Sequence, residues 1–198
     1  MDIEQTRELL KSKNIRYTER EYETEKEYWR HICEYYYCEH ASDDRVKAFV
    51  IPCRNGKRNI ELQLTEREGE YVFTELYFGT FCFELSEADL GESIGQELEK
   101  HLDNLLNGRY TVVSAADLKA GRLVFDGFSI DLPSETKTSL IEKLIKANGF
   151  IGKLRKQSFA YEIYDNKNIV TGEFNSMGKF WKATKLLRER EITEGQEQ

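Results

Sequence analysis

The sequence has no apolar run near the roughly 20 residues that a helix needs to cross a bilayer. Its first residues, MDIEQTRELLKSKN, hold no basic stretch followed by an apolar one, so we predict no secretory signal. Four cysteines in a chain of 198 residues without such a signal are typical of reduced thiols. We therefore expect a cytoplasmic protein without membrane attachment.

Motifs of known chemistry are missing as well. The sequence contains no G-x-S-x-G, P-loop, G-x-G-x-x-G, H-E-x-x-H or EF-hand pattern. Cys53 precedes Arg54, Lys57 and Arg58, which could activate its thiol, but an ordinary cysteine at a strand end is the simpler interpretation. His101 is interpreted as a boundary histidine beside the apolar stripe of a helix. We predict no catalytic residue and no cofactor, and the sequence leans against an enzyme.

Histidine is scarce, and two of the three histidines lie in one short segment, WRHICEYYYCEH, at residues 29–40. Four side chains in this segment are of the kinds that bind zinc, namely His31, Cys33, Cys38 and His40. Helix geometry opposes a joint site, because residues two apart on a helix point about 200° apart. We therefore predict no metal site, with these four residues as the candidates if one exists.

The start of this segment predicts the helix. TEKE at residues 24–27 fits a capping box, with Thr24 as the N-cap and Glu27 three residues later. The helix should run to about Tyr37. Its core-facing side is then formed by residues at i, i+3, i+4 and i+7, namely Trp29, Ile32, Cys33 and Tyr36.

What the sequence does have is core-forming material, with 39% hydrophobic and 12% aromatic residues. Residues 45–85 alternate in polarity between turn signals and predict a four-stranded antiparallel meander, with Asn55-Gly56 as a hairpin signal. Within the meander, Glu61, Glu75 and Glu84 are expected on a solvated sheet face.

Later segments predict further strands and helices. YTVV and RLVFDGFSIDL are expected as strands around SAADLKAG, which is predicted as a helical turn, and SFAYEIYD and NIVTGEF are expected to form a hairpin. Amphipathic helices are predicted at about residues 2–13, 87–107, 134–149 and 176–191. The predicted fold class is α+β, an antiparallel sheet packed with amphipathic helices.

Charge is divided unevenly along the chain, although the net value is only −7. Residues 1–136 carry 28 acidic and 17 basic side chains, whereas residues 137–190 carry 5 acidic and 12 basic ones. We predict one compact unit over residues 1–198. The alternative is a subdomain boundary near residue 133, with an acidic α+β part at 1–132 and a basic α+β part at 133–198.

The leading functional prediction is a cytoplasmic protein-binding or regulatory module, such as a bacterial inhibitor or immunity-type protein. Its partner would be another protein. Tyr35 and Tyr37 are the candidate partner-binding residues of the acidic part, because tyrosine is favoured at recognition surfaces. Acidic surfaces also speed the capture of basic partners.

Two alternatives come from other functional classes. The first is an enzyme or small-ligand-binding protein whose pocket is built from residues distant in sequence. The second is nucleic-acid binding through a basic C-terminal helix, by Lys179, Lys182 and Lys185 close to Trp181. The acidic majority of the chain opposes nucleic acid. A deep pocket with convergent polar groups would favour the first alternative, and a flat acidic surface rich in tyrosine would favour the leading prediction.

Overall fold

The computed structural model describes residues 1–32, 41–83, 85, 94–119, 121–129 and 158–174. Two antiparallel sheets and three helices make up this part of the chain, which confirms the α+β prediction. No described helix is both long enough and apolar enough to span a membrane.

The first sheet, sheet A, has five strands in the order β1-β2-β3-β4-β5. Their bounds are β1 Thr18–Tyr22, β2 Val46–Ile51, β3 Ile60–Arg67, β4 Glu70–Phe78 and β5 Phe81–Phe83. Strands β2 to β5 are the predicted meander, and β1 adds a fifth strand beside β2. Glu68 and Gly69 both have positive φ, at 54° and 86°, which gives the tight turn between β3 and β4 the twist that a two-residue hairpin needs.

The connection between β2 and β3 differs from a two-residue Asn-Gly hairpin. Ile51 and Ile60 are the last paired residues, so eight residues, 52–59, form a loop instead of a tight turn. The reason is tertiary, because this loop is held by the turn between two strands of the other sheet. The backbone N–H of Asn55 donates to the Asn166 carbonyl at 2.8 Å, and its side-chain amide donates to the Asp165 carbonyl at 2.6 Å.

The second sheet, sheet B, has the strand order β7-β6-β8-β9. Its strands are β6 Thr111–Asp117, β7 Arg122–Ser129, β8 Phe159–Tyr164 and β9 Ile169–Phe174. The predicted β8–β9 hairpin is confirmed, but the helical turn predicted within SAADLKAG is wrong. Residues 114–117 continue β6 and pair with both β7 and β8, because burial between two strands outweighs the helix preference of two alanines. The boundary near residue 133 lies outside the described residues and stays a prediction.

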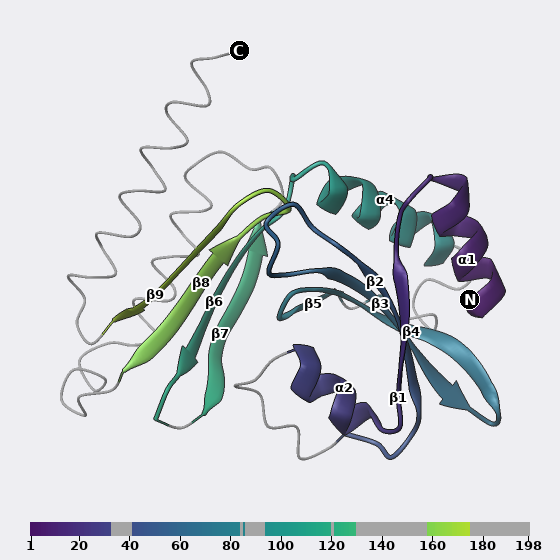
Figure 1. Ribbon diagram of the computed structural model, residues 1–198, viewed down its shortest axis with the longest axis horizontal. Helices are drawn as coiled ribbons and strands as arrows, with labels where there is room; N and C mark the ends of the chain where they lie inside the picture. The colour runs from purple at the N-terminus through teal and green to yellow at the C-terminus, as the bar shows by residue number, and fades with distance from the viewer. Residues whose placement is uncertain (33–40, 84, 86–93, 120, 130–157, 175–198) are drawn as a thin grey trace, which may run out of the picture.

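The main core lies between sheet A and two helices on one of its faces (Figure 1). These are α1, Ile3–Ser12, and α4, Ile94–Leu106. The amphipathic helix predicted at about residues 87–107 is confirmed over the described part, where the buried residues are Ile94, Leu98, Leu102 and Leu105 and Leu106 is half-buried. Gly108 follows this helix at φ +73°, the left-handed conformation in which glycine commonly ends a helix.

Helix α2, Glu25–Ile32, covers the other face of sheet A (Figure 1). Its predicted N-cap is confirmed, since the Glu27 N–H donates to Thr24 Oγ1 at 3.2 Å. Ile32 is buried as predicted, but the other fully buried residue is Tyr28, and Trp29 is only half-buried. The side of α2 that faces the sheet is therefore centred nearer to Tyr28 than the sequence predicted. Cys33 and Tyr36 lie outside the described residues.

Tyr164 of β8 joins the two sheets. Its hydroxyl donates to the Phe78 carbonyl at 2.9 Å and accepts from the Thr80 N–H at 2.9 Å. The ring occupies the space where a side chain at Gly79 would start, and Gly79 has φ +57°. The turn between β4 and β5 therefore requires glycine for two reasons, a left-handed backbone and the close approach of Tyr164.

Candidate functional site

Of the four zinc candidates, the structure describes only His31. His31 is exposed, and its Nε2 lies 3.1 Å from Arg20 Nη1 and 3.3 Å from Glu61 Oε1. Within the ranges that the structure describes, no group of three or more His, Cys, Asp or Glu residues could hold a metal ion. The remaining site candidates lie outside those ranges and stay predictions, namely Cys33, Tyr35, Tyr37, Cys38, His40, Lys179, Lys182 and Lys185.

Cys53 is buried and His101 is half-buried. Burial raises the pKa of the Cys53 thiol to about 12, which favours the protonated form at neutral pH. His101 Nδ1 lies 2.9 Å from the Tyr110 hydroxyl, and its ring packs 5.0 Å from the ring of Phe83. Burial lowers the pKa of His101, which favours the neutral imidazole.

The predicted solvated face of sheet A is covered by α2. Glu61 and Glu75 do share this face, on neighbouring strands β3 and β4, but Glu61 is only 6% exposed. Several buried polar atoms on this face have no hydrogen-bond partner among the described residues, namely the Tyr28 hydroxyl, Glu61 Oε2 and Gln63 Oε1. Burial, reinforced by the charge of Glu61, raises the pKa of Tyr28 well above its usual value. Glu84 lies outside the described residues.

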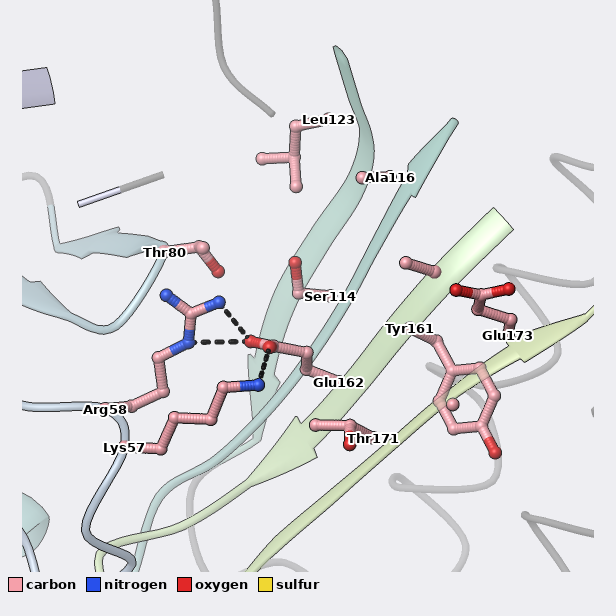
Figure 2. A pocket seen from close by; sticks show the side chains of 12 residues that line it. Lys57, Arg58, Thr80, Ser114, Ala116, Leu123, Tyr161, Glu162, Thr171 and Glu173 are labelled. Carbon is pink, nitrogen blue, oxygen red and sulfur yellow. Dashed lines mark hydrogen bonds and ion pairs between the residues drawn. The ribbon is translucent and has the colours of Figure 1, made fainter. Parts of the chain in front are cut away.

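A pocket opens where one face of sheet B meets the end of sheet A (Figure 2). Its volume is about 200 Å³. We call it the intersheet pocket and define it by its lining residues, which are Lys57, Arg58, Thr80, Ser114, Ala116, Leu123, Ala160, Tyr161, Glu162, Thr171, Gly172 and Glu173. They come from four parts of the chain, so no local pattern in the sequence marks the site.

The 52–59 loop positions the two cations of the pocket. Asn55 Oδ1 accepts hydrogen bonds from the backbone N–H groups of Lys57 and Arg58, at 3.0 and 2.9 Å. Asn55 and Gly56, at φ +70°, thus turn the chain so that both long side chains lie at one end of the pocket. Asn166 stabilises the arrangement from the other sheet, because its side chain accepts from the Arg54 N–H and donates to the Leu106 carbonyl.

Glu162 on β8 forms ion pairs with both Lys57 and Arg58 (Figure 2). Arg58 Nε and Nη2 lie 2.7 and 2.5 Å from Glu162 Oε2, and Lys57 Nζ lies 3.1 Å from Oε1. The side chains of Arg58 and Glu162 are 16% and 14% exposed, whereas that of Lys57 is 55% exposed. Arg58 Nη1 also donates to the Ile32 carbonyl at the end of α2. Arg58 is therefore anchored in the protein, and Lys57 is the cation that a ligand can reach.

The rest of the pocket is built from small side chains and hydroxyls. Ser114, Glu162 and Thr171 lie on one row across β6, β8 and β9, because Ser114 pairs with Glu162 and Glu162 with Thr171. Ala116, Ala160 and Glu173 form the next row in the same way. The pocket therefore presents hydroxyl groups beside the ion pairs and small apolar groups beyond them, with an exposed carboxylate at its rim.

This arrangement is suited to binding. A concave site with few, well-placed polar groups orients a ligand, and the paired Arg58 and Glu162 hold their geometry without one. The sequence analysis noted Lys57 and Arg58 only as neighbours of Cys53 and did not single out Glu162. Alternation along SFAYEIYD places Glu162 on one sheet face, but it does not say which loop faces it.

Comparison with known proteins assigns the chain to no family, since no family model, no curated protein and no solved structure matches it.

Proposed function

We propose that this protein binds a small polar molecule in the intersheet pocket. The observation that supports this is the convergence of charged and hydroxyl side chains from four distant parts of the chain on one cavity. A concave site with convergent polar groups distinguishes a ligand-binding protein from a flat recognition surface. The predicted alternative of a pocket built from sequence-distant residues thus becomes the favoured function.

The size of the pocket restricts the ligand. The volume of the pocket is about 200 Å³. Pockets for drug-sized molecules measure about 300–1,000 Å³. The expected ligand is therefore a small metabolite rather than a nucleotide or a peptide.

A titration followed by nuclear magnetic resonance tests the proposal. Small carboxylates, amines, sugars and amino acids are added in turn, while the backbone amides of Ser114 and Gly172 in the pocket are observed. We expect at least one class to shift these signals saturably. Thr171→Trp fills the pocket and should abolish the shift, whereas Thr18→Trp, at an exposed threonine of β1, should leave it unchanged. Failure of every class, or binding that survives Thr171→Trp, contradicts the proposal.

Strand β1 supports a second function, the predicted binding of another protein. Among the described strands β1 is an edge of sheet A, and Thr18, Glu19, Arg20 and Glu21 are all exposed. An exposed edge offers backbone groups to an added strand, and the two glutamates favour a basic partner. A cytoplasmic inhibitor or immunity-type protein of a bacterium, as predicted from the sequence, would use such an edge.

Charge reversal tests this second function. Glu19 and Glu21 are bound by Arg7 and Lys47 within the chain, so the partner has to compete with these ion pairs. We expect Glu19→Lys with Glu21→Lys to lose a partner that the wild type captures from cell extract. Glu8→Lys with Glu70→Lys makes the same charge change at exposed sites elsewhere and should retain it. Equal capture by both variants argues against partner binding at the β1 edge.

Nucleic-acid binding through Lys179, Lys182 and Lys185 stays a prediction.

A further inference from the structure

The intersheet pocket has a cationic end. Lys57 and Arg58 bring two positive charges to one carboxylate, that of Glu162, so one positive charge is left over there. The ammonium of Lys57 has three N–H donors, and among the described residues its only polar partner is Glu162. Because this side chain is also 55% exposed, Lys57 can donate to an anionic group of a ligand without giving up Glu162.

The pocket has an anionic end as well. Glu173 on β9 is exposed and pairs with Ala160, two residues along β8 from Glu162. A strand rises about 3.3 Å per residue, so the two rows are separated by about 7 Å. Figure 2 shows the Glu173 carboxylate on the opposite side of the pocket from Lys57 and Arg58. No described cation is paired with it.

Between these ends the pocket is lined by hydroxyl groups and by small apolar side chains. Ala116 and Ala160 are small enough to leave room for a short alkyl chain, and Leu123 offers it an apolar contact. The four charged side chains, two of each sign, sum to zero. A neutral pocket with separated charges attracts neither a simple anion nor a simple cation strongly, because each one meets a like charge at the other end.

We propose that the intersheet pocket selects a small zwitterion, whose carboxylate is bound by Lys57 and whose ammonium is bound by Glu173 across a short alkyl chain. This inference rests on the proposed function, since it names the ligand class of the same pocket. The row of Glu173 lies about 7 Å from the row of Glu162, with which Lys57 is paired, and this favours a ligand with its charges at the two ends of a chain over an α-amino acid, in which both charged groups are attached to one carbon. Arg58 and Glu162 position Lys57 and need not touch the ligand.

Calorimetric titration with a matched series of compounds tests the proposal. Glycine, β-alanine, γ-aminobutyrate and δ-aminovalerate vary the charge separation, whereas butyrate and butylammonium each carry one of the two charges. We expect a longer zwitterion to bind at least tenfold more tightly than glycine, butyrate or butylammonium. Binding of butyrate or butylammonium as tightly as any zwitterion overturns the zwitterion proposal but leaves the ligand-binding function standing. Binding of no compound in this series or in the resonance titration overturns both.

Two variants that each remove one charge test which end of the pocket binds which charged group of the ligand. Lys57→Met should reduce zwitterion affinity to the level of butylammonium, and Glu173→Gln should reduce it to the level of butyrate. Lys167→Met and Glu70→Gln remove one charge each at exposed sites outside the pocket and should bind as the wild type does. Each of the four positions is exposed, and unchanged unfolding midpoints exclude a folding defect. Unaltered selectivity in both pocket variants overturns the assignment.

Discussion

Replacing Tyr164 with phenylalanine removes one hydroxyl that connects the two sheets. The side chain is 1% exposed, and its hydroxyl serves both the Phe78 carbonyl and the Thr80 N–H at 2.9 Å. It also lies 3.1 Å from Thr80 Oγ1. The ring of phenylalanine fills the same space and keeps the edge contact with Phe78, at 5.1 Å between centroids. The substitution therefore isolates the hydrogen bonds from the packing.

The expected loss follows from the groups left behind. A buried donor or acceptor without its partner costs about 1–3 kcal/mol, and Tyr164→Phe leaves one of each. We expect a loss of about 2–6 kcal/mol in the free energy of unfolding, a large part of the roughly 5–15 kcal/mol typical of a domain. Urea unfolding followed by circular dichroism measures it, and the midpoint should fall while the slope stays constant.

Tyr17→Phe is the matched control. Tyr17 also packs against a phenylalanine, with its ring 5.3 Å from that of Phe49, but its side chain is only half-buried, and its hydroxyl forms no hydrogen bond with any described residue. This variant should change stability by less than about 0.5 kcal/mol, as substitutions away from buried polar contacts usually do. If Tyr164→Phe costs no more than Tyr17→Phe, the hydroxyl does not hold the two sheets together and the argument is refuted.

Three further predictions concern the cysteine and histidine residues. Burial raises the pKa of Cys53 to about 12, above the ordinary value of 9.0, so the protonated thiol stabilises the fold fully below pH 9 and this stability is lost between pH 9 and 12. Cys53→Ala should flatten the decline in unfolding free energy over that range, and an equal decline in the variant would contradict the assignment. Burial lowers the pKa of His101 below 6.5, so its neutral form stabilises the fold above that pH and the contribution is lost on acidification. His101→Gln should therefore unfold with a shallower pH dependence between pH 7 and 5, and the opposite change would show that the imidazole is stabilised as a cation. Finally, metal analysis of the purified protein should find no stoichiometric zinc. About one zinc per chain, lost on replacing Cys33 and Cys38, would establish the site that helix geometry disfavours.

Much of the fold is predictable because it depends on near neighbours in the sequence. Alternation in NIELQL places Ile60, Leu62 and Leu64 on one side of β3, and all three are buried in the main core. The apolar spacing of α4 and the capping residue Thr24 of α2 act over three or four residues, and both appear where the pattern puts them. Gly69 and Gly79 mark tight turns for the same local reason.

Burial on the second face of sheet A is not decided locally. Glu61 and Gln63 alternate with leucines as exposed polar residues do, yet α2 packs over them and leaves them buried. Ser114–Asp117 has the composition of a helical turn, but strands on both sides of it supply the pairing that makes it part of β6. In each case a partner from elsewhere in the chain outweighs the local preference.

The sequence by itself determined an α+β fold, the meander, the order of the described helices and the absence of known catalytic motifs. The tertiary structure decided where a ligand could bind, because the ion pair between Lys57 and Glu162 joins residues 105 positions apart. An Asn-Gly signal in the sequence suggests a turn, but only the contact of Asn55 with Asp165 and Asn166 makes it an eight-residue loop that carries two cations to sheet B. Periodicity reports which side of an element is buried, whereas a pocket depends on which elements face one another, and that is fixed only when the whole chain packs.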